Sequence, residues 1–190
     1  MTVVGITGKA GSGKSLLANA FEDKGAVRIC LDEVGHSVLH EIRDSLMKAF
    51  GSSVVSEGIV DRRELSNVVF SSHEKLAVLN QLTHPLIKSR TLEILSGLNG
   101  TLAVIEGALL FDIGLAEACD KVIWIESSEE IIHKRLETRG MDKDKIERIV
   151  ALHRGLEKYR SLCDAVIIND STPEDLVQRL FQLLREWGVE

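Results

Sequence analysis

Proline and aromatic residues are scarce in this chain of 190 residues: there are two prolines, and aromatic residues make up 4%. Few prolines leave long stretches able to form helices and strands. No apolar run is long enough to span a bilayer, and the first residues read as a strand rather than a leader, so we expect no membrane segment and no targeting segment. The length and the apolar content of 44% predict one compact domain.

Cysteine is also rare, and the net charge is negative. Cys30, Cys119 and Cys163 are widely spaced and form no metal-type pair, which is typical of reduced thiols in a cytoplasmic protein. The net charge of −6 argues against a general nucleic-acid-binding protein, because nucleic-acid backbones attract basic surfaces. We therefore expect no nucleic-acid partner, no membrane partner, and a monomer or a weakly associating protein.

The most informative motif lies near the N-terminus. Residues 8–15 read Gly-Lys-Ala-Gly-Ser-Gly-Lys-Ser, which matches G-x-x-x-x-G-K-S/T, the phosphate-binding P-loop. An apolar run (Val3–Thr7) precedes the motif and a helical pattern (Leu16–Lys24) follows it, as a P-loop requires; a plain strand–helix turn rich in glycine is the alternative. We expect Lys14 to meet the β- and γ-phosphates of ATP and Ser15 to hold Mg²⁺. The predicted ATP-binding residues here are Gly8, Ala10, Gly11, Ser12, Gly13, Lys14, Ser15 and Leu16.

Beyond the first strand, four short β-branched runs alternate with helical patterns. Such nearly continuous apolar runs are typical of parallel strands covered on both faces. The sequence therefore predicts an α/β, three-layer P-loop NTPase fold with a five-stranded parallel sheet. The four later strands are expected at Ala26–Leu31, Thr101–Gly107, Lys121–Glu126 and Asp164–Asn169.

Helical periodicity fills the long segment 32–100, where no strand is predicted. One helix there is expected to carry an apolar stripe, and two helix starts are indicated by the capping box at Ser71–Glu74 and by Thr83-His84-Pro85. The last helix is expected to start with Thr172 as its cap and Pro173 in its first turn. The apolar stripe of the helix in segment 32–100 consists of Val34, Val38, Ile42, Leu46 and Phe50.

Two carboxylates follow predicted strands. Asp32 comes after the second strand, where it could accept a proton from an attacking hydroxyl and help to hold Mg²⁺, or could cap the next helix. Glu106 ends the third strand, where it could support the metal through water or face solvent. Position alone leaves the Asp32 alternatives equal and favours the functional role for Glu106.

Basic residues concentrate between Lys134 and Arg160. Arg135 and Arg139 are one helical turn apart, directly before Gly140, so they could close over a triphosphate; a solvated helix face is the alternative. Arg62 could bind an anionic substrate or could simply lie at a helix start. Taken alone, the basic cluster favours the solvated helix face, and for Arg62 the residues do not choose between the two roles.

These segments together resemble the dephospho-CoA kinase family from Met1 to about Leu176. The most specific part is His84-Pro85-Leu86-Ile87 placed after Asp61-Arg62-Arg63-Glu64-Leu65. The chain departs from the family where an Asp-x-Asp becomes Cys30-Leu31-Asp32 and where a lid glutamine becomes His153. Ala108, Asp112 and Ile168 are further departures.

The resemblance implies roles for several residues. Asp32 matches the catalytic aspartate, with Lys14 and Arg139 as its catalytic partners. Arg62, His84, Asp32 and Glu106 match the substrate side, and Asn169 joins Arg135 and Arg139 on the ATP side. Ser15 is the implied Mg²⁺ ligand, and Asp32 and Glu106 are candidates that act through water.

The implied activity is transfer of the ATP γ-phosphate to the ribose 3′-hydroxyl of dephospho-CoA, with Mg²⁺, in the cytoplasm. The rivals are a kinase for another small alcohol or nucleoside, and a nucleotide-binding module that has lost phosphoryl transfer. Residues 1–190 are expected to form a single kinase domain. Its core is about 1–31, 101–139 and 161–190, its helical substrate-binding insert about 32–100, and its lid about 140–160.

Overall fold

The computed structural model describes residues 1–100 and 102–189, which form two compact units. The first unit consists of Met1–Cys30 with Leu98–Glu190, and the second unit is Leu31–Gly97. Each unit has its own hydrophobic core and is described by itself.

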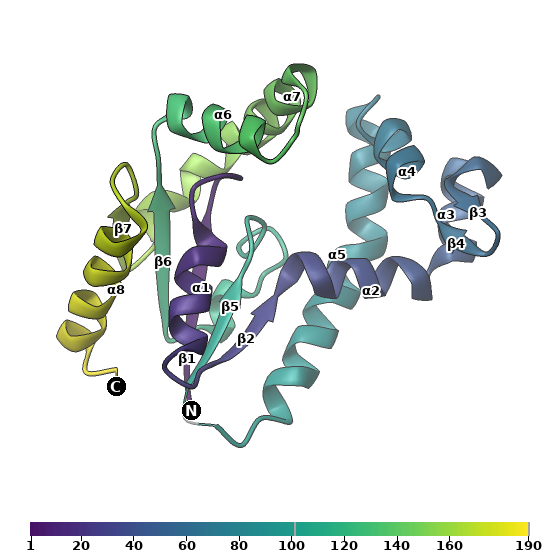
Figure 1. The fold of residues 1–190 in the computed structure, drawn as a ribbon. Coiled ribbons are helices and arrows are strands. Elements are labelled where there is room, and N and C mark those ends of the chain that lie inside the picture. The colour runs from purple at the N-terminus through teal and green to yellow at the C-terminus, as the bar shows by residue number, and fades with distance from the viewer. Residues whose placement is uncertain (101, 190) are drawn as a thin grey trace. The chain divides into compact units, whose positions relative to one another are not determined.

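A five-stranded sheet is the centre of the first unit (Figure 1), and its spatial order is β2-β5-β1-β6-β7. All neighbouring strands are parallel, which confirms the predicted sheet. The carboxyl ends of the strands therefore lie at one edge, where ligands bind in open α/β sheets. Thr101, predicted to open the third strand, lies outside the described residues. The strands are β1 (Thr2–Gly8), β2 (Val27–Cys30), β5 (Leu102–Glu106), β6 (Lys121–Glu126) and β7 (Ala165–Ile168).

Helices α1 (Lys14–Glu22) and α8 (Pro173–Trp187) contribute to the main core of this unit. Leu17 and Leu180 are fully buried there together with Val4 of β1. Helix α8 starts as predicted: Thr172 accepts a hydrogen bond from the Asp175 amide, and Pro173 is its first residue. Helix α1 starts two residues earlier than predicted, so Lys14 and Ser15 belong to its first turn.

The rest of the first unit includes two packed helices, α6 (Glu129–Thr138) and α7 (Lys143–Arg154), and the short 3-10 segments η2 (Ala116–Ala118) and η3 (Gly155–Leu162). Asp142 caps α7 by accepting a hydrogen bond from the Lys145 amide. The two helices share a small apolar core, which holds α7 against α6. Its buried members are Ile132, Leu136, Ile146 and Val150.

The second unit is mainly helical, as the periodicity of residues 32–100 predicts, with a separate core of Leu46, Val54, Val60, Leu65 and Val69. Its elements are α2 (Leu31–Glu41), α3 (Arg43–Phe50), η1 (Ser52–Val54), β3 (Val55–Ser56), β4 (Ile59–Val60), α4 (Arg62–Val69) and α5 (His73–Ser96).

Two predictions for the start of this unit were wrong. The apolar stripe predicted for one helix is divided between α2 and α3, because Ile42 leaves the helical conformation at φ −102° and ψ 16°. A two-stranded antiparallel hairpin, β3–β4, lies where no strand was predicted. Its turn residues Glu57 and Gly58 both have positive φ, 52° and 78°. Such a turn matches the twist of a hairpin, and the glycine between short apolar pairs was the available signal.

The predicted helix start at Thr83-His84-Pro85 was also wrong, because α5 runs without a break through Pro85. A proline inside a helix removes one backbone hydrogen bond and costs about 3 kcal/mol. Burial of one face offsets that cost: Thr83, Ile87, Thr91 and Leu95 recur every four residues and are all buried. The cap of α5 is Ser72, whose hydroxyl accepts a hydrogen bond from the Lys75 amide, one residue later than the predicted capping box.

Candidate active site

The P-loop leaves β1 at Gly8 and enters α1 at Lys14, so a strand and a helix start fix its two ends. Gly8, Gly11 and Gly13 have φ values of 142°, 77° and 108°, which favour glycine. A Cβ atom on Gly8 would lie 2.3 Å from the Ile125 carbonyl oxygen, and one on Gly13 would lie 2.2 Å from Asn169 Nδ2. The loop therefore lies so close to its surroundings that neither glycine can be replaced without displacing a neighbour.

Asn169 and Ser127 brace the loop from β7 and β6. The buried Asn169 side chain donates a hydrogen bond from Nδ2 to the Ser12 carbonyl oxygen at 2.7 Å. Ser127 Oγ donates to the Asn169 carbonyl oxygen at 2.8 Å, which fixes Asn169 in turn. The predicted ATP-binding residue Asn169 is thus brought to the loop, where it contacts the backbone.

Arg135 of α6 contacts the same part of the loop. Its Nη1 donates to the Gly11 carbonyl oxygen at 3.2 Å, and its Nη2 donates to Asn169 Oδ1 at 3.3 Å. Burial lowers the pKa of Arg135, nearby Asp170 opposes that shift, and Arg139 adds to it. Arg135 therefore holds its guanidinium group beside the loop, where it contacts Gly11 and Asn169. Arg139, which caps the end of α6, is exposed.

The lysine and the two serines of the motif provide the polar atoms of the loop. Lys14 Nζ donates to the carbonyl oxygens of Gly8 and Lys9, at 3.1 and 2.9 Å, so the ammonium group lies across the loop. Ser15 is exposed in the first turn of α1. Among the described residues, the buried Ser12 Oγ has no hydrogen-bond partner. The loop thus combines glycines, an ammonium group and a helix start, which together fit a bound polyphosphate.

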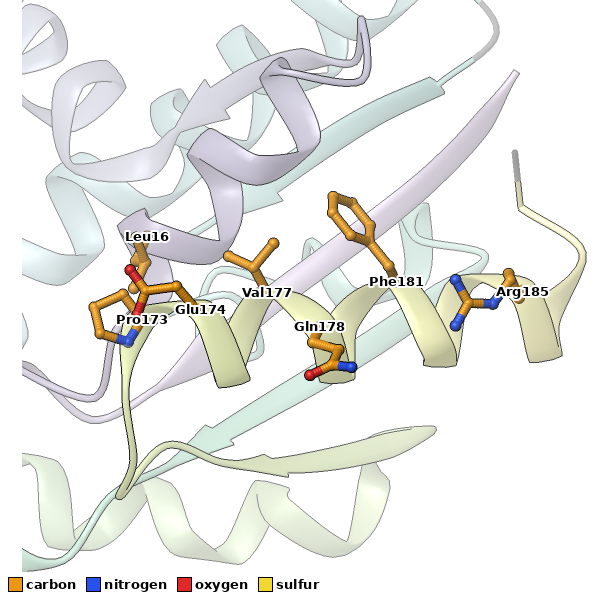
Figure 2. Close-up of a pocket in the computed structure, with 7 residues that line it drawn as sticks. All are labelled: Leu16, Pro173, Glu174, Val177, Gln178, Phe181 and Arg185. Carbon is orange, nitrogen blue, oxygen red and sulfur yellow. The ribbon is translucent and has the colours of Figure 1, made fainter.

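Leu16 lies beside a groove rather than in the loop (Figure 2). It is partly buried against the main core and faces the first turn of α8 near Pro173 and Glu174. The groove continues along α8 past Val177 and Phe181 to Arg185. The structure thus places the Leu16 side chain against α8, and its contact with ATP stays a prediction.

Glu106 is buried at the end of β5 and is paired with Arg28 of β2. Arg28 Nε donates to Glu106 Oε1 at 2.9 Å, and Arg28 Nη2 contacts the same oxygen. The Glu106 side chain is only 3% exposed, so this pair stabilises a carboxylate that would otherwise be costly to bury. Arg28 was missed from the sequence, because nothing local indicates that β2 and β5 are neighbours. The substrate and metal roles of Glu106 stay predictions.

Replacing Arg28 by methionine is expected to lower the free energy of unfolding by about 2 kcal/mol, because Glu106 would remain buried without its partner. Urea denaturation measures the loss. The double variant Arg28→Met/Glu106→Gln, which removes both charges, should recover at least half of it. An unchanged midpoint in Arg28→Met would show that the ion pair contributes no stability.

Asp32, Arg62 and His84 belong to the second unit. Asp32 is the second residue of α2 and is exposed, in the first turn rather than at the cap. Arg62 is the first residue of α4, and Asp61 caps that helix by accepting hydrogen bonds from the amides of Arg63 and Glu64. His84 is half-buried in the middle of α5. Asp61, which belongs to the motif Asp61-Arg62-Arg63-Glu64-Leu65, therefore stabilises the start of α4 as its cap.

His36 links two of these residues. Burial lowers the pKa of His36, and Arg62 lowers it further, while Asp32 and Glu33 act in the opposite direction. The charges of Arg62 and Asp32 therefore both act on the imidazole ring of His36. Along α2, His36 lies one helical turn after Asp32. The sequence pattern did not single out His36 for this, because only the i, i+4 spacing from Asp32 could have indicated it.

Segment 143–162 contacts the loop through His153 and Glu157. His153 Nδ1 accepts a hydrogen bond from the Ala10 amide at 2.9 Å, and Lys9 Nζ donates to Glu157 Oε1 at 2.5 Å. Neither contact was predicted, because both join residues far apart in the sequence. No helix among the described residues is long and apolar enough to cross a membrane.

The braced P-loop at the carboxyl edge of this parallel sheet defines a P-loop nucleotide-binding protein. The fold is similar to that of a dephospho-CoA kinase structure from Campylobacter jejuni, with a TM-score of 0.63 at 24% identity, covering 97% of this chain and 96% of that one. A crystal structure of TT1252 from Thermus thermophilus has a TM-score of 0.83 at 29% identity, covering 97% of each chain.

Sequence comparison gives the family. The dephospho-CoA kinase family model matches residues 2–175. The dephospho-CoA kinase of Aquifex aeolicus is 30% identical over 191 residues, which cover 98% of this chain and 97% of the relative. The chain belongs to the dephospho-CoA kinase family, and it is therefore an ATP-dependent phosphotransferase.

Proposed function

We propose that this protein transfers the γ-phosphate of ATP to the ribose 3′-hydroxyl of dephospho-CoA and releases coenzyme A and ADP. Family membership supports the acceptor. The observation that carries the reaction is the P-loop, where Gly8, Gly11 and Gly13 adopt positive φ and Lys14 Nζ lies across the loop at the start of α1. Backbone amides of a glycine-rich loop, a helix N-terminus and an ammonium group are the groups that bind phosphate oxygens.

On the ATP side, the amides of the loop and the start of α1 bind the phosphates. Lys14, which lies on the Gly8 and Lys9 carbonyl oxygens, exchanges them for β- and γ-phosphate oxygens. Arg135 and Asn169 keep the loop in shape, and Arg139 adds positive charge against the charge that develops during transfer. Leu16 contributes apolar contact at the start of α1.

Mg²⁺ neutralises phosphate charge when it is bound with ATP. The Ser15 hydroxyl, exposed at the helix start, fits such an ion. Asp32 and Glu106 are the carboxylates that family membership proposes as its supports through water. Of these, Glu106 already has Arg28 as a partner, so Ser15 is the principal ligand that we propose.

During transfer, the 3′-hydroxyl oxygen forms a bond to the γ-phosphorus as the bond from that phosphorus to the ADP oxygen breaks. Asp32, which matches the catalytic aspartate of the family, accepts the hydroxyl proton, and its exposed carboxylate is accessible to a substrate. Arg62 and His84, in the insert 32–100, bind the acceptor, and the lid at about 140–160 excludes water. We expect the protein to act as a monomer in the cytoplasm.

The test is ADP release by the purified protein with Mg·ATP, with and without dephospho-CoA, together with the mass of the product. We expect ADP release to depend on dephospho-CoA and the product to carry one added phosphate on the ribose. ATP binding without any stimulation by dephospho-CoA would contradict the proposal. An acceptor screen would then separate a kinase for another small alcohol or nucleoside from a module without phosphoryl transfer.

A further inference from the structure

The P-loop is held by a side chain from the middle of segment 143–162. His153 lies one residue before the end of α7, and its Nδ1 accepts a hydrogen bond from the Ala10 amide at 2.9 Å. A ring nitrogen that accepts a hydrogen bond carries no proton, so the imidazole acts here through its lone pair. This contact joins two points 143 residues apart in the sequence.

Ala10 is a position where the loop needs such a support. It lies between Gly8 and Gly11, which have φ values of 142° and 77° and therefore give the backbone unusual freedom. The next contact along the loop is from the Ser12 amide to the Lys9 carbonyl oxygen, at 3.2 Å. The Ala10 and Ser12 amides therefore each have a partner within the protein.

The acceptor itself is well fixed. Helix α7 is capped by Asp142 and packed on α6 through Ile146 and Val150, so the imidazole sits on a supported helix. A second contact from the same segment strengthens the connection: Lys9 Nζ, with a side chain only 14% exposed, pairs with Glu157 at 2.5 Å. Two adjacent loop residues are therefore held by one stretch of chain.

We propose that His153 is a positioning residue for nucleotide binding, which sets the P-loop backbone through the Ala10 amide before ATP arrives. This proposal rests on the proposed function only because it takes ATP as the ligand of the P-loop. A loop held in its binding conformation loses less entropy when the ligand binds, so affinity rises without any contact between His153 and ATP. Removing the His153 imidazole leaves the Ala10 amide without its hydrogen-bond partner and the loop without that restraint.

The experiment compares His153→Leu with His153→Asn, which keeps an acceptor oxygen at the position of Nδ1. Calorimetry with Mg·ATP, without dephospho-CoA, should show about tenfold weaker binding for His153→Leu and a Kd within about threefold of the unaltered protein for His153→Asn. Gln182→Ala, an exposed substitution on α8 outside the loop and the lid, is the control and should leave the Kd unchanged. Equal affinities for the Leu and Asn variants would overturn the proposal.

A measurement on the unaltered protein keeps the test independent of folding in the variants. An N–H···N hydrogen bond gives a measurable scalar coupling between its two nitrogens, so the Ala10 amide and His153 Nδ1 should be coupled in ¹⁵N spectra. Absence of that coupling would overturn the proposal even if His153→Leu failed to fold. Neither experiment contains dephospho-CoA. A protein that binds ATP but does not phosphorylate dephospho-CoA would therefore contradict the proposed function without contradicting the role of His153.

Discussion

Replacing Asp32 with asparagine is expected to lower kcat by about 10³-fold while the Kd for Mg·ATP changes by less than about threefold. The asparagine amide has nearly the shape of the carboxylate but cannot accept the proton of the attacking hydroxyl, and general-base catalysis contributes about 10²–10⁴-fold. Because Asp32 is exposed, the substitution leaves the packing of α2 intact. Steady-state ADP release and calorimetry measure the two quantities separately.

The matched control for this prediction is Glu33→Gln. Glu33 is the next residue in the first turn of α2, is also exposed, and contributes the same kind of charge to the helix start. Both variants should lose a similar, small amount of stability, because each removes one favourable charge near a helix N-terminus, about 0.5 kcal/mol. Near-normal turnover in Asp32→Asn, or an equal loss of turnover in Glu33→Gln, would contradict the assignment of Asp32 as the base.

The sheet and the P-loop could be predicted because their signals are local. Val3–Thr7 is a continuous apolar run directly before the glycine-rich motif, and the structure places β1, the loop and α1 there in that order. The capped start of α8 at Thr172 and Pro173 is equally local, since a cap and a first-turn proline act within one helical turn.

Other features depend on contacts that no short segment reveals. Pro85 is a sound signal for a helix start by itself, yet it lies inside α5 because the buried face from Thr83 to Leu95 extends across it. Ile42 keeps the spacing of one helix while its backbone ends that helix. In both cases tertiary packing decides against local propensity.

In the candidate site, too, local sequence signals predicted some features, while others depend on contacts between distant segments. The eight residues of the motif predicted where the loop lies, but not what holds it. Arg135 and Asn169 were expected on the ATP side, and the structure adds that they contact the loop backbone. His153 and Arg28 act through partners 143 and 78 residues away in the sequence, so only the folded chain identifies them.

Gly13→Ala is expected to weaken ATP binding by at least about 100-fold. The new Cβ would lie 2.2 Å from Asn169 Nδ2, on a backbone whose φ of 108° an L-residue rarely adopts. Asn169 must then move, which breaks its 2.7 Å bond to the Ser12 carbonyl oxygen and its contact with Arg135. The loop would lose two of its supports at the point where the phosphates bind, and calorimetry with Mg·ATP measures the loss.

Gly25→Ala controls for the loss of stability that alanine causes at a positive φ outside the loop. Gly25 also has a positive φ, 84°, but a Cβ there would meet nothing within 4 Å. This variant should lose about 1 kcal/mol of stability through strain and keep its ATP affinity. If Gly13→Ala bound ATP as well as Gly25→Ala does, the close approach of Asn169 to the loop would not matter for nucleotide binding. A large difference would instead show that the loop position, unlike Gly25, requires glycine for nucleotide binding.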